Sequence, residues 1–211
     1  MSYICLLANK NGAAASGDTR VSKNFSGDKP FKVINNKRRK VFTSNEDKVI
    51  WAMAGVTKVF GWDYFKQINR VMKNDSVSFA LRLEKYVKIM KRATRRFHKY
   101  FKTTGSSTIL FASYHEEKAP QIGSITIQNG EVLSDKRYNV PVFVETGSNY
   151  AQLSDRKKYV PGEDDTIGEL KMNAAKRVAE AVRTDKKHFH EDAYYRPAVG
   201  GTVLVKAIEA K

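Results

Sequence analysis

The chain has 211 residues, and 41% of them are hydrophobic, which suffices for one domain with a full core and excludes a disordered protein. Lysine and arginine total 38 against 22 acids, and the resulting formal net charge of +16 attracts polyanions and acidic proteins without defining an activity. The single cysteine, Cys5, excludes an internal disulfide, and no apolar run approaches the ~18 residues that a membrane span needs. We therefore expect a single domain over residues 1–211 of a soluble, cytoplasmic protein.

The N-terminal part of the sequence is typical of antiparallel strands. Asn11-Gly12 predicts a hairpin turn between an apolar run and a run of small residues. Residues 22–38 are polar and predict a loop or a weak hairpin. Strands are expected over 2–9, 13–20, 40–44 and 48–54.

Two helices should follow these strands. Residues 58–72 predict the first, and Asn74-Asp75-Ser76 predicts the cap of a longer helix over about 77–102. One face of this longer helix is the most basic stretch of the chain: Arg82, Lys85, Lys88, Lys91, Arg92, Arg95, Arg96, Lys99 and Lys102. Such a face could dock on an acidic partner or on phosphates, although a solvated helix face is the simpler interpretation.

The remainder of the chain returns to strands, with one more helix before the last of them. The helix is expected over 166–184, with Thr166 as its cap and Glu169 at the capping-box position. The strands are expected over 107–115, 121–128, 131–137, 141–146 and 201–208. This order predicts an α+β fold in which two antiparallel sheets lie face to face, with helices on the outside.

The common signatures of nucleotide and metal chemistry are absent from the sequence. It contains no GxxxxGK[ST], GxGxxG, HExxH or GxSxG motif, so no cofactor and no metal are expected. Ser2 suggests a different chemistry, because removal of Met1 would leave a serine at the N-terminus. Its α-amine, with an unperturbed pKa near ~8, could take the proton from its own hydroxyl during attack on an amide.

Four stretches, in collinear order, resemble the proteasome β-subunit-like family of N-terminal-nucleophile hydrolases, which includes the bacterial proteasome-like peptidases. They are SYICLLANKNGAAASGDTRVS at 2–22, KVFTSNEDKVIWAMAG at 40–55, ETGSNYAQ at 145–152 and HEDAYYRPAVGGTV at 190–203. The resemblance implies the four-layer αββα sandwich of that family, with serine where most members carry threonine.

The resemblance also implies a catalytic set: Ser2, Asp18, Lys40, Gly55, Ser148 and Asp192. In this set Ser2 is the nucleophile, Lys40 keeps the Ser2 amine neutral and Asp18 holds Lys40. The backbone N–H of Gly55 would donate a hydrogen bond to the oxyanion, and Ser148 and Asp192 would hydrogen-bond around the Ser2 amine. The implied substrate-binding residues are Arg20, Ser22, Phe42, Met53 and Thr57. Ser22 would lie on the strand that pairs with a peptide, and the apolar residues suggest a preference for apolar side chains.

These features predict a peptide-bond hydrolase that works through an acyl-enzyme, in a homo-oligomeric ring. Its partners would be a peptide or protein substrate and an ATP-dependent unfoldase, and the lack of a long apolar run predicts no membrane contact. Two alternatives stay open. One is a peptide ligase or small-amide hydrolase of the same mechanism, and the other is a catalytically silent assembly or nucleic-acid-binding protein. The basic helix is the best support for nucleic acid, which is not the favoured partner.

Overall fold

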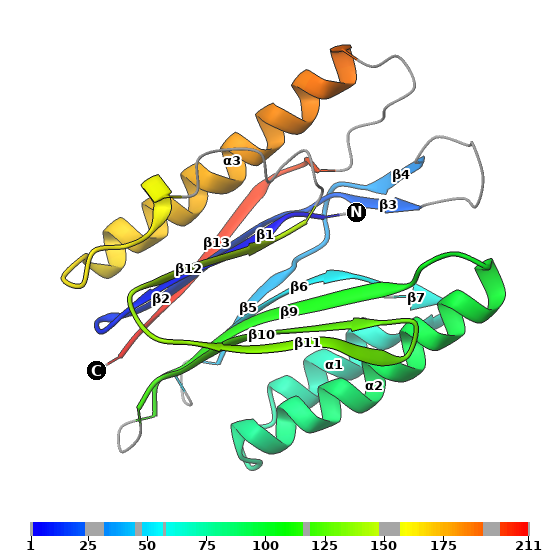
Figure 1. Ribbon diagram of the computed structural model, residues 1–211, viewed down its shortest axis with the longest axis horizontal. Coiled ribbons are helices and arrows are strands. Elements are labelled where there is room, and N and C mark those ends of the chain that lie inside the picture. Colours follow the sequence, from blue (N-terminus) through cyan, green and yellow to red (C-terminus); the bar gives the residue numbers. More distant parts are fainter. Residues whose placement is uncertain are drawn as a thin grey trace.

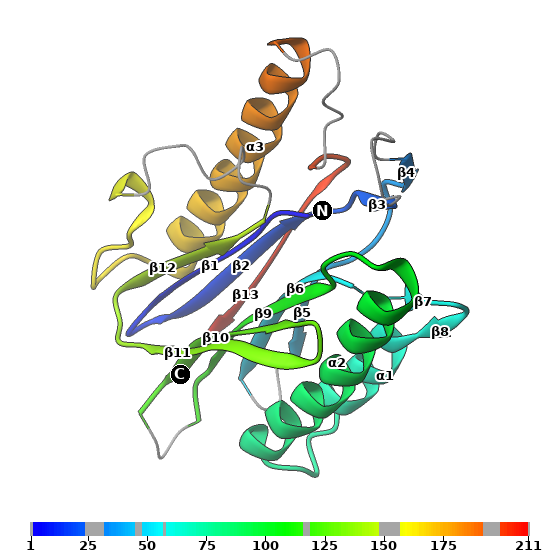
Figure 2. The ribbon, with the colours of Figure 1, turned by 45° about the vertical axis from the view of Figure 1, so that its right-hand side comes forward.

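A computed structural model describes residues 2–23, 32–44, 48–56, 58–115, 119–147, 157–191 and 199–210, with the backbone alone described at 21–23, 32–35 and 188–191. Two antiparallel sheets lie face to face in it, and helices cover the outer face of each (Figures 1 and 2). The expected α+β class and its four-layer αββα sandwich are therefore confirmed.

The first sheet has the strand order β12-β1-β2-β13. Its strands are β1 (Ile4–Asn9), β2 (Gly12–Asp18), β12 (Val142–Thr146) and β13 (Val203–Glu209). The expected turn joins β1 to β2, with Asn9 paired to Gly12. Residue 12 must be glycine, because its φ is +146° and a Cβ there would lie 2.2 Å from the carbonyl oxygen of Ile208.

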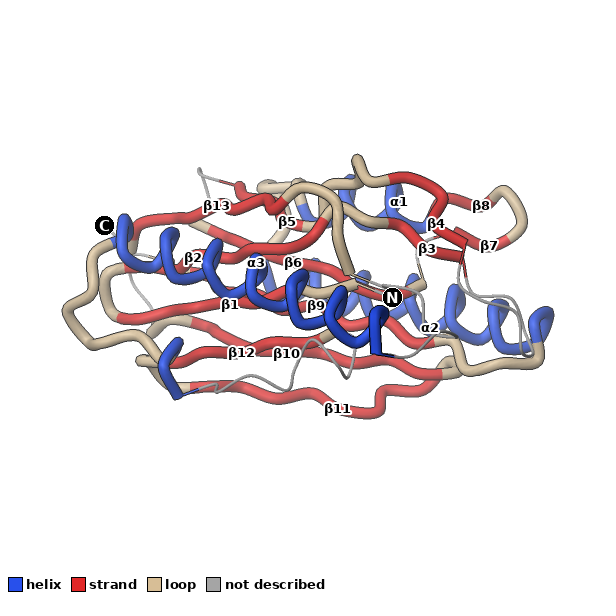
Figure 3. The backbone as a smooth tube through the Cα atoms, turned by 90° about the horizontal axis from the view of Figure 1, so that it is seen from above, coloured by secondary structure: helices blue, strands red, loops and turns tan. Residues whose placement is uncertain are grey.

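Helix α3 (Ile167–Glu191) covers the outer face of this sheet and runs across it when seen from above (Figure 3). The helix is longer than expected, but its capping box is confirmed. Thr166 N donates to Glu169 Oε2 over 2.7 Å, and Glu169 N donates back to Thr166 Oγ1 over 3.3 Å. Leu170 and Val178 pack from the helix against the sheet, in a cluster that includes Cys5.

The second sheet has the order β11-β10-β9-β6-β5. Its strands are β5 (Val41–Ser44), β6 (Val49–Gly55), β9 (Ser106–Ser113), β10 (Gln121–Gln128) and β11 (Glu131–Tyr138). Asn129 and Gly130 form the two-residue turn between β10 and β11, and both have the positive φ that such a turn requires, 52° and 96°. The core between the sheets is made by small and aliphatic side chains of both, such as Leu6, Ala52 and Leu110.

The helix expected over 58–72 begins only at Tyr64. The residues before it form a short hairpin, β7 (Lys58–Val59) and β8 (Trp62–Asp63), followed by α1 (Tyr64–Met72). Phe60 and Gly61 make the turn with φ of 44° and 81°, a conformation that a right-handed helix excludes. Asp63 then caps α1 by accepting a hydrogen bond from Lys66 N at 3.1 Å.

The long basic helix is α2 (Phe79–Phe101), and its cap is Ser78 rather than the expected Asn74-Asp75-Ser76. Together α1 and α2 cover the outer face of the second sheet (Figure 1). Residues 22–38 contribute a small hairpin, β3 (Val21–Lys23) with β4 (Lys32–Asn35), as one of the two expectations had it. Within the described ranges, no helix is both long and apolar enough to cross a membrane.

Arg82 does not belong to the exposed basic face, where the helical spacing placed it. Its side chain is buried and turns back toward the loop between the two helices. Nε donates to the carbonyl of Val77 at 2.6 Å, and the two terminal nitrogens donate to the carbonyls of Met72 and Asp75 at 3.2 and 3.5 Å. The guanidinium therefore satisfies the carbonyl of the last residue of α1 and two carbonyls of the loop that follows.

Replacing this arginine tests its structural role. Arg82→Ala should lower the free energy of unfolding by about 2–4 kcal/mol, because it leaves buried carbonyls without donors. Arg92→Ala is the matched control on an exposed position of the same helix and should change stability by less than about 0.5 kcal/mol. Urea denaturation of both variants measures the difference. Equal losses of unfolding free energy would show that the hydrogen bonds of Arg82 do not stabilise the fold.

Candidate functional site

A buried ion pair lies at the end of the sandwich that holds the N-terminus. Lys40 Nζ is 2.7 Å from Asp18 Oδ1, and both side chains are almost fully shielded from solvent. Asp18 is the last residue of β2 in the first sheet, and Lys40 directly precedes β5 in the second. The pair therefore joins the two sheets at this end.

Asp18 accepts hydrogen bonds on both carboxylate oxygens. Oδ1 accepts from Tyr3 N at 2.7 Å as well as from Lys40. Oδ2 accepts from Arg20 N and from Gly200 N, both at 3.1 Å. Four donors around one buried carboxylate stabilise its charge, and they tie together the start of β1, the end of β2 and the approach to β13.

The other hydrogen bonds of Lys40 join it to two nearby backbone segments. Nζ donates to the carbonyl of Arg20 at 2.8 Å, and the Lys40 carbonyl accepts from Met53 N at 2.9 Å. An ammonium has three protons, and no acceptor for the third is found in the described part of the chain. Burial lowers the pKa of Lys40, the Asp18 carboxylate opposes this by raising it, and the charges of Arg20 and Arg38 lower it further.

Ser2 directly precedes Tyr3, whose backbone contacts this pair. The nitrogen that Tyr3 donates to Asp18 belongs to the peptide bond between Ser2 and Tyr3, so Asp18 Oδ1 links that peptide to the Lys40 ammonium. On its other side the Ser2 backbone lies against Gly147, where an added Cβ would come within 2.4 Å of the Ser2 carbonyl oxygen. Glycine is needed there for this close approach.

The ring of Tyr3 enters a second buried charge network that the sequence did not reveal. Its hydroxyl donates to Glu145 Oε2, and Arg177 donates to the same oxygen through Nε at 2.9 Å and through a terminal nitrogen at 2.7 Å. The Arg177 guanidinium also lies 4.8 Å from the centre of the Tyr3 ring. Burial raises the pKa of Tyr3 well above its ordinary range. Charged residues within the apolar runs of β12 and α3 were the only signal in the sequence.

The second sheet carries three more of the expected site residues. Gly55 ends β6 with φ +111°, and a Cβ there would lie 2.2 Å from the carbonyl oxygen of Ser106, so the backbone itself requires glycine. Phe42 stacks on Trp51 with ring centres 5.7 Å apart, and Met53 is buried in the core between this sheet and the helices.

Arg20 lies beside the ion pair and is half-buried. Its Nε donates to Asn36 Oδ1 at 3.1 Å, and its guanidinium covers Gly200, where a Cβ would come within 2.5 Å of it. Gly200 thus contributes both a donor to Asp18 and room for Arg20. The sequence analysis did not assign Gly200 to the site, although the Gly-Gly pair before the last strand was a signal for it.

The other expected residues are only partly visible. Ser22 lies on β3, whose backbone alone is described. Ser148, Asp192 and Thr57 lie outside the described residues. In the parts of the chain that are described, no group of three or more histidine, cysteine, aspartate or glutamate side chains could hold a metal ion.

Comparison with known proteins gives no match by sequence, either to a protein-family model or to a curated protein. Comparison of structures does give matches. The structure is similar to that of Anbu. A mutant of Anbu from Hyphomicrobium sp. strain MC1 is similar with a TM-score of 0.58 and 12% identity, over 99% of this chain and 82% of that one.

Two further solved structures agree with this match. Anbu from Yersinia bercovieri, described as an ancestral beta-subunit, gives a TM-score of 0.58 at 12% identity, over 98% of this chain and 82% of its own. The helical assembly of the Anbu complex from Pseudomonas aeruginosa gives 0.57 at 13% identity, over 98% and 84%. Identities this low show the fold alone.

The family suggested by the sequence is therefore corrected. The four short stretches resemble proteasome β-subunits, but no model of that family matches the chain, and the structural likeness is a distant one to Anbu. The stretches misled because hairpin glycines, a Gly-Asp-x-Arg strand end and a Gly-Gly turn serve the backbone of this fold. They do not distinguish one branch of it from another.

The ion pair can be tested by its effect on stability. Asp18→Asn should cost about 3–5 kcal/mol of unfolding free energy, because it leaves the Lys40 ammonium buried without its counter-charge. The double variant Asp18→Asn/Lys40→Met removes that charge and should be more stable than Asp18→Asn alone. Urea denaturation of the two variants decides, and a double variant that is less stable than the single one would contradict the coupling.

Proposed function

We propose that this protein is an N-terminal-nucleophile peptidase, with Ser2 as the nucleophile of a chain from which Met1 has been removed. The observation that carries the proposal is the buried pair of Asp18 and Lys40, in which the carboxylate also holds the Ser2–Tyr3 peptide. A buried pair of full charges beside the first residues of a chain is costly to keep for stability alone. Positioning a cation near an N-terminal serine gives it a chemical purpose.

The reaction would run in two steps. The Ser2 hydroxyl attacks the scissile carbonyl while the Ser2 α-amine takes the hydroxyl proton, and collapse of the tetrahedral intermediate returns a proton to the leaving amine. This breaks the amide bond and leaves an ester on Ser2 Oγ. Water, deprotonated by the same amine, then attacks the ester and releases the carboxylic acid with Ser2 restored.

Lys40 would support both steps as an ammonium. Its charge disfavours protonation of a nearby amine and so keeps the Ser2 base neutral, and its third proton can stabilise negative charge on the reacting oxygen. Arg20 and Arg38 strengthen the same positive field, as their effect in lowering the pKa of Lys40 indicates. The Gly55 N–H as oxyanion donor, with Ser148 and Asp192 around the amine, completes the proposed catalytic set.

The substrate would be an extended peptide. Strand β3, which carries Ser22 and pairs with β4, offers an edge for such a chain. Phe42, Met53 and Thr57, with Arg20 nearby, would form its binding surface and favour apolar side chains. Because one of the similar Anbu structures is a helical assembly, we also propose that this protein self-associates. The ring and the unfoldase partner stay predictions from the sequence.

A covalent probe tests the nucleophile. A peptide epoxyketone reacts with both the hydroxyl and the free amine of an N-terminal serine, so intact mass should show loss of Met1 and one added probe per chain. Ser2→Ala should add no probe, because the hydroxyl is gone, and Ser76→Ala is the matched control at an exposed serine. A Ser2→Ala variant that still takes the probe or cleaves peptides at the wild-type rate would end the proposal.

A second substitution tests the cation. Lys40→Ala should slow labelling by about 10²–10³-fold, the usual cost of removing one group that stabilises the oxyanion. Lys73→Ala removes an exposed lysine with no ion pair in the described part of the chain and should leave the rate unchanged. A Lys40→Ala protein that folds and labels normally would assign the pair to stability alone.

The pH dependence of labelling tests the protonation states of the Ser2 amine and of Lys40. The rate should fall at low pH as the Ser2 amine is protonated, and fall again at high pH as Lys40 loses its proton. Because burial lowers the pKa of Lys40, the alkaline fall should begin below the ordinary lysine value of about 10.4. Lys40→Arg keeps its charge and should lose the alkaline fall. An unchanged alkaline limb in that variant would show that Lys40 does not titrate in the reaction.

A further inference from the structure

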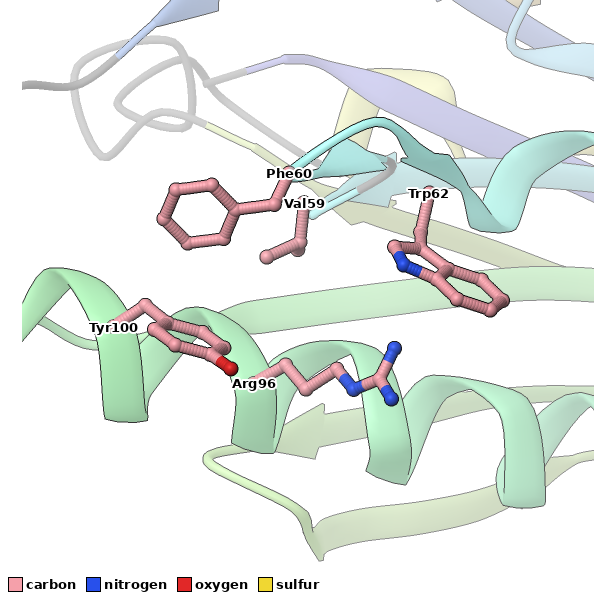
Figure 4. Close-up of a pocket in the computed structure, with 5 residues that line it drawn as sticks. All are labelled: Val59, Phe60, Trp62, Arg96 and Tyr100. Atoms are coloured by element: carbon pink, nitrogen blue, oxygen red, sulfur yellow. The ribbon is translucent and has the colours of Figure 1, made fainter.

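Three large aromatic side chains stand exposed side by side where the β7–β8 hairpin meets the end of α2. Phe60 is 63% exposed, Trp62 56% and Tyr100 57%. The Phe60 ring packs edge-on to Tyr100 with centres 4.8 Å apart, and Arg96 lies 5.1 Å from the centre of the Trp62 ring (Figure 4). We call Phe60, Trp62, Arg96 and Tyr100 the hairpin–helix surface.

The backbone of this hairpin is strained at Phe60, whose ring belongs to the surface. Phe60 has φ of 44°, which costs a residue other than glycine roughly 1–2 kcal/mol. Asparagine before Gly61 would form the same turn without that cost, since Asn-Gly is the preferred pair for it. Within the molecule the Phe60 ring stacks on Phe101 with centres 5.3 Å apart, but the residue stays 63% exposed, so much of it is open to a ligand.

The rings enclose a shallow, open hollow of about 230 Å³, lined by the surface residues and Val59. This is less than the ~300–1,000 Å³ of pockets that bury a whole small molecule. The hollow suits flat groups that stack on the rings while the rest of the ligand continues along the surface.

Cations flank the rings along one stripe of α2. The exposed members of this stripe are Lys85, Lys88, Arg92 and Lys99, with Lys102 at the C-cap of the helix, and none makes an ion pair within the described ranges. Asp75 and Glu84 are the only acids between residues 64 and 101. A ligand with repeated negative charges would be attracted to this stripe.

We propose that the hairpin–helix surface binds single-stranded nucleic acid, with bases stacked on the rings and phosphates along the α2 stripe. Exposed stacking rings beside a basic track are the combination by which single strands are held without sequence preference. A second copy of this chain is disfavoured here because it would bring the same positive charge, and a duplex hides the base faces that the rings would use. The proposal is independent of Ser2.

Tryptophan fluorescence gives a direct test. The chain has two tryptophans, and Trp51 is fully buried, so a ligand that stacks on the surface should quench Trp62 alone. Titration with a 20-residue oligothymidylate at low salt should give saturable quenching, weakened by added salt. Tyr100→Ala and Phe60→Asn should each weaken binding about tenfold. In Phe60→Asn the relief of the turn offsets the lost ring packing on Phe101, so Tm should change little. Ser2→Ala should bind as the wild type does.

Charge variants and other polyanions separate stacking from simple attraction. Lys88→Gln/Arg92→Gln should reduce the dependence of log Kd on log salt by about 0.7 per cation, whereas Lys171→Gln/Lys176→Gln, on exposed positions of α3, should not change it. If heparin binds as tightly as the oligonucleotide and the ring variants change nothing, only charge is at work and the proposal is overturned. Equal affinity for polyglutamate would overturn it in favour of an acidic protein partner.

Discussion

The buried pair of Asp18 and Lys40 is the constraint on which this end of the molecule depends. Removing two charges from water costs several kcal/mol per ion and is offset only when their hydrogen bonds are well satisfied. Here Asp18 accepts from four donors and Lys40 donates to two acceptors, drawn from both sheets. Apolar residues of similar volume often serve stability as well as such a pair does. Stability alone therefore does not explain why two charges occupy this position, whereas the cation that the proposed mechanism requires would explain it.

A second constraint acts on Tyr3, the residue that follows Ser2, through its side chain. The backbone of Tyr3 is held by Asp18 at the strand end, while its ring reaches the helix layer and is held by Glu145 and Arg177. Two buried charge networks thus act on one residue through different atoms. A reactive group next to a residue held in this way has little freedom to reorient, which is the preorganisation that catalysis by a positioned nucleophile needs.

Features coded by neighbouring residues could be predicted from the sequence, and those made by distant partners could not. The turn at Lys10-Asn11 directly before Gly12, the turn at Asn129-Gly130 and the Thr166–Glu169 capping box are local, and the structure contains all three. Arg82 appeared exposed because helical spacing records the direction of Cβ, whereas its long side chain folds back onto carbonyls of the preceding loop.

The candidate site shows the same division. The resemblance to a known family singled out Asp18 and Lys40, which the structure brings together, while their catalytic role stays a prediction. In the network of Tyr3, Glu145 and Arg177, the hydrogen bond from Tyr3 to Glu145 spans 142 positions of the sequence, and no local pattern predicts such a contact. The wrong family assignment has a related cause, since the stretches that carried it encode turns and strand ends shared by any chain with this backbone.

The β7–β8 hairpin was misread as helix for a reason that bears on its function. Val59, Phe60 and Trp62 provide the apolar residues that a helix start would need, and the positive φ values of Phe60 and Gly61 depart from that pattern. A sequence that is consistent at every level leaves such conflicts where another demand outweighs folding. At the ion pair the conflict is a charge kept in the core, and every donor and acceptor around Asp18 shows how the fold accommodates it. At the hairpin the Phe60 ring packs on Tyr100 and Phe101, yet the residue stays 63% exposed, which fits the binding role proposed for this surface.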